Sequence, residues 1–177
     1  SAGLVNADRE VLSNVVASQV DLHTRYGGIV PEIASRQHII DIRPVVNEAL
    51  HVAGVNFDDV TAVAVTYGPG LAGSLLIGIN FAKGLAAATG KPLVAVNHLE
   101  GHLSAAWAIN DKYGFVETKI LEDLVNRQIP ILGILVSGGH TELVIINNPL
   151  DFVLIGETRD DAAGEAFDKV ARILGLR

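Results

Sequence analysis

The sequence contains no cysteine among its 177 residues. A disulfide framework and a thiolate zinc site are therefore excluded, so imidazole, carboxylate, hydroxyl or water must hold any metal ion. The chain also lacks an uninterrupted apolar run of the roughly 18 residues that a membrane-spanning helix needs, and we expect no association with a membrane. A soluble, cytoplasmic protein is the simplest interpretation.

Positive charge is also scarce. The 13 Lys and Arg residues against 20 Asp and Glu residues give a formal net charge of −7. A surface that coats nucleic acid needs clustered Lys and Arg, so this balance argues against such a surface but leaves local contacts open. The basic residues that could contact phosphates are Arg25, Arg36, Arg43, Lys169 and Arg172. The first residue is Ser1 rather than Met, which indicates a processed, trimmed or partial chain.

Hydrophobic residues make up 49% of the chain, enough for a sizeable core. Near the start, β-branched residues flank a polar break at residues 6–10, which predicts a hairpin between Gly3 and Val20. Helical spacing of apolar residues follows over residues 31–53, with Pro44 marking a kink or a new helix start.

Strands and helices alternate in the next segment. Residues 60–66 are apolar on both alternations, which predicts a parallel strand buried on both faces. A glycine loop then leads into a helix that Gly90 can end, and residues 92–96 form a second strand. This order predicts an α/β sheet with flanking helices.

The character of the sequence changes after Trp107. Residues 110–128 are polar and weakly periodic, which predicts a surface excursion or a lobe boundary. A hairpin over residues 131–146 and a helix over residues 160–174 follow. We therefore predict two lobes, the first over residues 1–128 and the start of the second over residues 129–177.

Two histidines, His98 and His102, are four residues apart directly after the second predicted strand. A helix places this spacing on one face, and two imidazoles on one face are typical ligands of a metal ion. Asn97 stands at the N-cap of that helix, and Gly101 leaves room beside the imidazoles. The alternative is one histidine packed against the sheet and the other solvated. Glu100 lies about 200° around the helix from His98, which argues against a zinc-protease general base.

Two glycine-rich segments are candidates for anion binding. Residues 68–74 precede a helix amino terminus, although a tight turn or an interface surface explains this loop equally well. The segment Ser137-Gly138-Gly139-His140-Thr141 indicates anion binding more specifically. A Gly-Gly hairpin with hydroxyl side chains on both sides lets a phosphate or adenylate approach backbone amides. A plain β-turn remains its alternative.

Charged groups occur in two further helical segments. Asp160 and Asp161 stand at a predicted helix start, where capping alone explains them, and Asp168 lies deeper as a candidate ribose acceptor or ion-pair partner. Residues 31–38 carry a carboxylate, a guanidinium and an imidazole, for which a solvated helix face is the default.

Taken together, these motifs resemble the TsaD family of tRNA threonylcarbamoyl transferases, formerly called the O-sialoglycoprotein endopeptidase or glycoprotease family. The matching segments occur in the family's order and span nearly the whole chain. They are Pro31-Glu32-Ile33-Ala34-Ser35-Arg36, Gly68-Pro69-Gly70-Leu71, His98-Leu99-Glu100-Gly101-His102, Val136-Ser137-Gly138-Gly139-His140-Thr141 and Asp160-Asp161-Ala162-Ala163-Gly164-Glu165-Ala166-Phe167-Asp168-Lys169.

The resemblance implies a two-lobed, ribonuclease H-like fold of the actin, Hsp70 and sugar-kinase type, with a mixed sheet and flanking helices. It implies transfer of threonylcarbamoyl from threonylcarbamoyl-adenylate to the exocyclic amine of the adenosine 3′ of the tRNA anticodon. His98 and His102 would hold one divalent metal ion, iron or zinc. An adenylate or ATP-type ligand would contact Asp168 and the turn residues Leu135, Val136, Ser137, Gly138 and Gly139. TsaB-like and TsaE-like accessory proteins would be partners.

The chain also departs from the family pattern. The family's opening strand, the later glycine loop, the nucleotide-binding asparagine and the carboxylate that completes the metal site are not among these residues, which predicts an incomplete two-lobed fold and a fragment that is inactive by itself. No side chain is assigned as a general base. Two other functions stay open: a metal-dependent glycoprotein endopeptidase, and a non-catalytic scaffold subunit that docks a related protein through the Gly68 loop and its helix.

Overall fold

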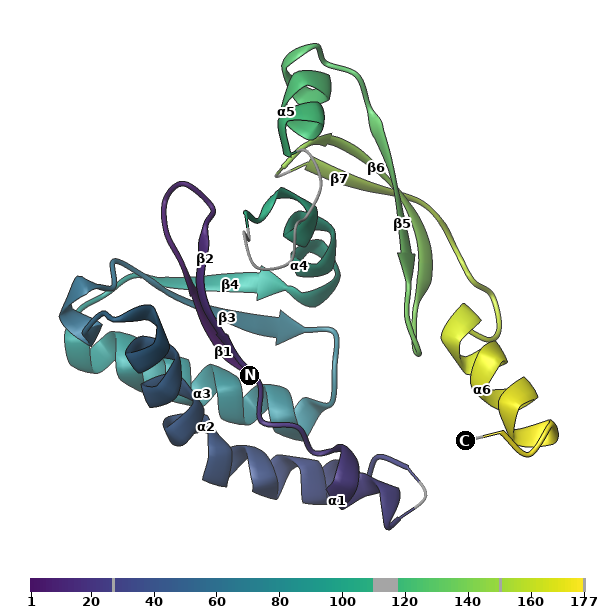
Figure 1. Ribbon diagram of the computed structural model, residues 1–177, viewed down its shortest axis with the longest axis horizontal. Coiled ribbons are helices and arrows are strands. Elements are labelled where there is room, and N and C mark those ends of the chain that lie inside the picture. Colours follow the sequence, from purple (N-terminus) through teal and green to yellow (C-terminus); the bar gives the residue numbers. More distant parts are fainter. Residues whose placement is uncertain (27, 110–117, 150, 177) are drawn as a thin grey trace. The chain divides into compact units, whose positions relative to one another are not determined.

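The computed structural model describes residues 1–26, 28–109, 118–149 and 151–176, and it divides into two compact units (Figure 1). The first unit consists mainly of Ser1–Gly101. The second contains His102–Trp107 and the described residues from 118 onward. The division falls inside helix α4 (His98–Ser104). The predicted lobes, residues 1–128 and 129–177, stay a prediction.

The first unit opens with the predicted hairpin. Strands β1 (Ala2–Val5) and β2 (Val11–Val15) pair antiparallel. The polar break between them is a turn in which the Asn6 side-chain oxygen accepts hydrogen bonds from the N–H groups of Asp8, at 3.0 Å, and Glu10, at 2.9 Å. This side chain replaces the strand partners that the turn amides lack. The short helix α1 (Val20–Thr24) follows the hairpin.

Helix α2 (Pro31–Ala53) has the predicted bounds. Pro31 occupies the first turn, where a missing N–H costs nothing, and Gly54 ends the helix with a φ of 68° that favours glycine. Pro44 lies inside the helix without ending it. Helix α2 packs against the hairpin and against α3 (Ala72–Thr89), and a short 3-10 turn, η1 (Phe57–Asp59), leads to the next strand.

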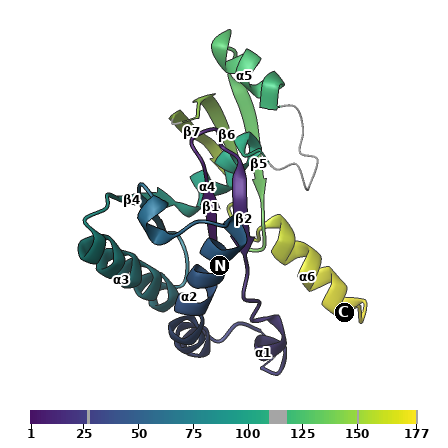
Figure 2. The same cartoon turned by 60° about the vertical axis from the view of Figure 1, so that its left-hand side comes forward.

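Strands β3 (Val63–Gly68) and β4 (Leu93–Asn97) pair in parallel, with α3 as the crossover between them (Figure 1). Figure 2 shows α3 beside α2. The predicted strand–helix–strand order is therefore confirmed, and Gly90 ends α3 as expected. The prediction that the first of these strands is buried on both faces is wrong. Ala64, inside the predicted strand, is exposed, and Tyr67, near the end of the observed strand, is 53% exposed. This sheet has only two strands within the described residues, and α3 packs mainly against β3, which leaves other strand residues uncovered.

Helix α3 is also long and apolar enough, by length and composition alone, to cross a membrane. The core helix of a soluble protein passes the same test. In the structure, α3 joins two parallel strands and packs against α2 and β3. That is the position of a crossover helix in an α/β unit.

The second unit contains a three-stranded antiparallel sheet in the order β5 (Ile131–Val136), β6 (Thr141–Asn148) and β7 (Asp151–Glu157). Its core is formed by the buried residues Trp107, Val144 and Ile146. Trp107 ends the 3-10 turn η2 (Ala105–Trp107), so a residue next to the predicted boundary is the centre of this core. The hairpin over residues 131–146 is confirmed, but β7 was not predicted.

Of the two interpretations of residues 110–128, the surface excursion is wrong for residues 118–126, and the lobe boundary stays a prediction. Residues 118–126 of the expected surface excursion form helix α5 (Thr118–Asn126), and Leu121 and Val125 pack against the Trp107 core. The two residues are four apart, so they lie on one helix face and bury it together. Residues 110–117 of the same prediction lie outside the described residues.

The last described helix is α6 (Ala163–Ile173), which starts three residues later than predicted. Three apolar side chains along this helix, Phe167, Val170 and Ile173, are exposed, Phe167 by 76%. The α/β class that the sequence predicts is confirmed, because both units contain helices together with paired strands, parallel in β3 and β4 and antiparallel in the other sheets.

Candidate functional site

The amino end of α4 is built as the sequence predicts. Strand β4 ends at Asn97 and α4 begins at His98. The Asn97 side-chain oxygen accepts hydrogen bonds from the N–H groups of Leu99, at 2.9 Å, and Glu100, at 3.4 Å. Asn97 therefore caps the helix, and the two histidines follow directly after the carboxyl end of a parallel strand.

His98 and His102 occupy successive turns of one face of α4, because the helix is continuous from His98 to Ser104. Both are exposed. A Cβ added at Gly101 would make only an ordinary contact, 3.8 Å from Val96 Cγ1. Packing within the described residues thus does not require this glycine. No group of three or more His, Cys, Asp or Glu residues placed to hold a metal ion exists among the described residues.

The second candidate segment is the turn between β5 and β6. Ser137 N–H donates to the His140 carbonyl at 2.8 Å, and the Ser137 hydroxyl oxygen accepts from His140 N–H at 2.9 Å. These bonds close the four-residue connection between the paired residues Val136 and Thr141. Ser137 and His140 thus bond to each other, and Gly138 and Gly139 lie between them.

Gly138 and Gly139 form the open side of this turn. A Cβ added at either glycine would have no neighbour within 4 Å in the described residues, so the side of the turn to which their side chains would point is open, although Gly164 lies against the Gly138 backbone. The Leu135 side chain is 9% exposed and belongs to the interior, so only its backbone is left for a ligand, whereas Val136 is 56% exposed. Backbone atoms at this turn are thus open to a group that approaches from solvent.

The acidic residues before α6 do not cap it, contrary to the sequence prediction. Ala162 is the N-cap and makes no side-chain hydrogen bond. Asp161 instead forms an ion pair with Lys169 at 2.5 Å, and Glu165 lies 3.3 Å from the same ammonium group. The sequence could not separate these alternatives, because an acid near a helix start serves equally well as a cap or as a partner for a lysine two turns away.

The same two carboxylates raise the pKa of Lys169 above its ordinary value of 10.5, with the hydrogen bond to Asp161 as the largest cause. A raised lysine pKa stabilises the folded state as long as the lysine is protonated in both states. This contribution is therefore complete below pH 10.5 and is lost as the pH rises beyond it.

Asp168 lies on α6 and is exposed. Ala163 is the first residue of the helix, and a rise of 1.5 Å per residue places Asp168 about 7.5 Å further along the axis. Asp168 and the glycine turn belong to the same unit, and the amino end of α6 contacts that turn through Gly164.

Gly164 makes the closest backbone approach in this region. A Cβ at this position would lie 2.6 Å from the Ser137 carbonyl oxygen and 2.9 Å from Gly138 Cα. Both are backbone atoms and cannot rotate away. We therefore expect Gly164→Ala to lower the free energy of unfolding by about 1–3 kcal/mol, measured by urea denaturation, because an overpacked contact forces the backbone to shift.

Gly84→Ala is the matched control for this substitution. Gly84 lies within α3 and a Cβ there would meet nothing within 4 Å. Alanine is favoured over glycine inside a helix, so the control variant should be more stable by about 0.5–1 kcal/mol. Stabilisation by Gly164→Ala as well would show that helix propensity, not the contact with the turn, decides this position.

The two remaining candidate segments lie where α2 packs against α3. Arg36 and Glu32 form an ion pair at 3.5 Å with both side chains largely exposed, which confirms the solvated helix face for these two residues. His38 differs, because it is half-buried and its Nδ1 lies 2.7 Å from the Ala34 carbonyl oxygen. A Cβ at Gly73 would run into the Ser35 hydroxyl, so the start of α3 lies directly against α2. The loop before it, which includes Gly68 and Gly70, is therefore a strand-to-helix turn that allows this close helix packing.

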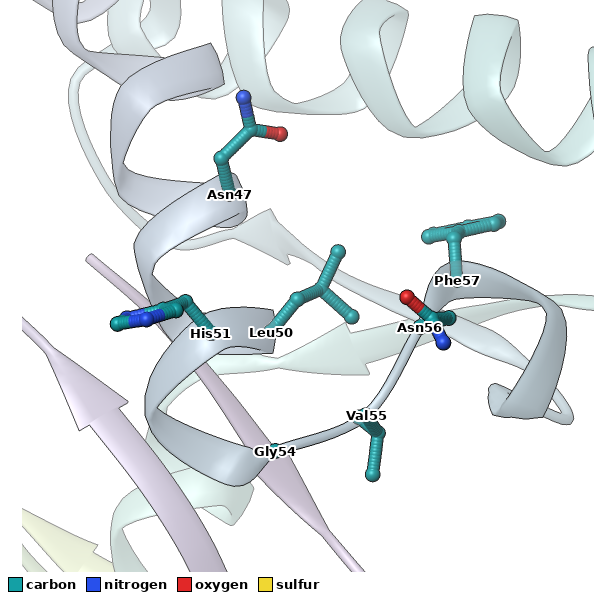
Figure 3. A pocket seen from close by; sticks show the side chains of 7 residues that line it. All are labelled: Asn47, Leu50, His51, Gly54, Val55, Asn56 and Phe57. Carbon is teal, nitrogen blue, oxygen red and sulfur yellow. The ribbon is translucent and has the colours of Figure 1, made fainter.

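An open pocket of about 390 Å³ lies at the carboxyl end of α2 (Figure 3). Leu50 extends toward Asn56 and Phe57 there, while His51 points to the other side of the helix. His51 lies 3.9 Å from Glu48, its ion-pair partner when protonated, and is exposed. None of the residues that the sequence marks for ligand or metal binding lines this pocket, whose lining is Asn47, Leu50, His51, Gly54, Val55, Asn56 and Phe57.

The fold and the two motif regions define an α/β protein whose candidate metal ligands follow a strand end and whose glycine turn lies against a helix start. Residues 10–177 match the family model of TsaD, tRNA N6-adenosine threonylcarbamoyltransferase. The chain therefore belongs to the TsaD family, as the sequence motifs indicate.

Individual proteins agree with the family match. Over 176 residues the chain is 56% identical to the tRNA N6-adenosine threonylcarbamoyltransferase of Clostridium perfringens, and 54% identical to that of Clostridium botulinum. Each match covers 99% of this chain and 48% of the relative, so the chain spans about half the length of the curated relatives it matches. Among solved structures, YeaZ from Pseudomonas aeruginosa is 22% identical, with a TM-score of 0.42, covering 68% of this chain and 52% of that chain.

Proposed function

We propose that this chain is part of an enzyme that transfers the threonylcarbamoyl group from threonylcarbamoyl-adenylate to the exocyclic amine of the adenosine 3′ of the tRNA anticodon. The observation that carries the proposal is the match of residues 10–177 to the family of that name. The open glycine turn against the start of α6 supports it, because an adenylate needs a close approach to backbone.

The adenylate site comprises the turn residues Leu135 to Gly139 and Asp168. Gly138 and Gly139 admit the ligand because neither carries a side chain, and Val136 offers an exposed apolar surface. Leu135 contributes through its backbone, since its side chain is interior. The Asp168 carboxylate accepts a hydrogen bond from the nucleoside part, which is a charge-assisted bond to a hydroxyl group.

His98 and His102 supply two nitrogen ligands to one divalent ion, iron or zinc. The donors fit such an ion, because imidazole binds both metals and the pair projects from one exposed helix face. The other ligands come from outside the described residues, from water or from substrate. When bound, the ion supplies Lewis-acid polarisation of a carbonyl oxygen. In the overall transfer, the amine nitrogen bonds to the threonylcarbamoyl carbon, the bond from that carbon to the phosphate oxygen breaks, AMP leaves and the amine gives up one proton.

The endopeptidase alternative is disfavoured by α4 itself. Glu100 is two residues after His98, and a continuous helix carries it about 200° away from that imidazole. A zinc peptidase needs its glutamate beside the metal-bound water. Transfer activity without proteolysis is the outcome that this geometry favours.

A partner-docking role coexists with the transferase in our proposal. Tyr67, Leu71 and Leu76 are exposed apolar side chains around the glycine loop and the start of α3. Such a surface suits an accessory protein of the TsaB type, while tRNA and a TsaE-like protein are the other partners that we propose. The cytoplasm is the compartment that we propose for the reaction.

Asp168→Ala tests the adenylate site in the protein expressed from its own gene. Loss of a hydrogen bond to a charged group costs about 1.5–3 kcal/mol, so we expect the KM for threonylcarbamoyl-adenylate to rise by about 10- to 100-fold. Transfer to tRNA is measured by mass spectrometry of the released nucleosides. The matched control is Asp123→Ala, which removes an exposed acid paired with Arg127 on α5. A wild-type protein that modifies no tRNA, with its accessory proteins present, would refute the proposed function.

A further inference from the structure

The amino end of α6 is held by another element of the chain rather than by its own N-cap. Ala162 has no side chain that accepts a hydrogen bond, and it is 2% exposed. Ala163 N–H donates instead to the Thr141 hydroxyl oxygen at 2.8 Å, across 22 residues of sequence. The next amide, Gly164 N–H, donates to the Ser137 carbonyl at 3.1 Å. The first two amides of the helix are thus capped by the two ends of the glycine turn.

Thr141 also fixes the segment that leads into α6. Its carbonyl accepts a hydrogen bond from Thr158 N–H at 2.9 Å, just after β7 ends. The Thr158 hydroxyl in turn donates to the Asp161 carbonyl at 2.7 Å. One residue at the start of β6 therefore binds the chain on both sides of the connection between β7 and α6.

Apart from the ion pair between Lys169 and Asp161, the body of α6 contributes little to its own placement within the described residues. The side chains of Phe167, Val170 and Ile173 are exposed along it. The contacts that set its direction are therefore those at its amino end, where Gly164 lies against Ser137 and Gly138 with no space for a Cβ. A small rotation at this end moves Asp168, about 7.5 Å along the axis, relative to the turn.

We propose that Thr141 is a positioning residue for the adenylate: its hydroxyl locks the start of α6 to the glycine turn and so sets the place of Asp168. This inference rests on the proposed function. Replacement of the hydroxyl by a methyl group, Thr141→Val, keeps the side-chain volume but leaves Ala163 N–H without its acceptor. Thr141→Ser keeps the hydroxyl and restores the contact.

The test compares these two variants in the protein expressed from its own gene. We expect Thr141→Val to raise the KM for threonylcarbamoyl-adenylate about tenfold, with kcat within twofold of the wild-type value, and Thr141→Ser to return the KM to within about threefold. Thr89→Val is the matched control, since the Thr89 hydroxyl donates within α3 to the Leu85 carbonyl. Its KM should equal that of the wild type.

A double-mutant cycle with Asp168→Ala separates positioning from a general effect on the fold. If Thr141 acts through Asp168, Thr141→Val adds no further rise in KM to the Asp168→Ala variant. The inference is overturned if the KM increases of the two substitutions multiply in the double variant, or if Thr141→Ser does not restore the KM. The proposed function stays intact in both cases. Absence of transfer by the wild type overturns both.

Thr141→Val can also impair folding, so a second measurement is needed. Amide hydrogen exchange of Ala163 and Gly164 should accelerate in Thr141→Val and slow again in Thr141→Ser. Calorimetric titration with AMP provides a binding readout that needs no tRNA. If Thr141→Val does not fold, the comparison is made between Thr141→Ser and Thr141→Ala instead. Wild-type AMP affinity in the alanine variant overturns the inference.

Discussion

Replacement of both His98 and His102 by alanine should abolish metal binding by α4 and lower tRNA threonylcarbamoylation by more than about 100-fold, because Lewis-acid stabilisation of a developing charge is worth several kcal/mol. Both histidines are exposed on one face of a short helix, so their removal disturbs no core. Metal content is measured by elemental mass spectrometry of the purified protein, and modification by analysis of tRNA nucleosides.

The control for the histidine pair is His51→Ala. His51 is an exposed histidine near the end of α2, with its Nδ1 3.9 Å from a Glu48 carboxylate oxygen. Its removal should change neither the metal content nor the modification. If the double variant also keeps both, the metal site is elsewhere. If it loses the metal and still modifies tRNA, the ion serves structure rather than transfer.

Replacement of Trp107 by alanine should have the largest effect on stability. Trp107 is 4% exposed and forms the core of the second unit with Val144 and Ile146, and Leu121 packs against that core. Removal of a buried tryptophan leaves a cavity that its neighbours fill only in part, at a cost of about 3–5 kcal/mol. We expect a loss of this size in the free energy of unfolding, measured by urea denaturation.

Tyr26→Ala serves as the comparison for Trp107, because Tyr26 is an aromatic residue that is 58% exposed. A surface substitution of this kind changes stability by about 0.5 kcal/mol or less. Similar losses for the two variants would mean that the sheet of the second unit does not depend on Trp107. Because α5 contributes Leu121 and Val125 to the same core, its amide protection should fall together with that of β6.

Local signals in the sequence were sufficient for much of the fold. The bounds of α2 followed from Pro31 and Gly54, since a proline suits a first helical turn and a glycine with positive φ ends a helix. The cap at Asn97 likewise follows from its own side chain and the two amides that come after it. Helix α5 was not predicted, because polar residues surround Leu121 and Val125 in the sequence. Strand β7 was not predicted, because its apolar residues after Asp151 follow directly on the hairpin.

By itself, the sequence determined the α/β class, the position of the histidine pair after a strand, the glycine turn and the family, since each depends on neighbouring residues or on motif order. Only the tertiary structure decided what the acids and the hydroxyl near α6 do. Asp161 pairs with Lys169 instead of capping the helix, and Thr141 caps it from 22 residues away. Contacts between residues far apart in sequence arise from how strands and helices pack, which no local pattern records.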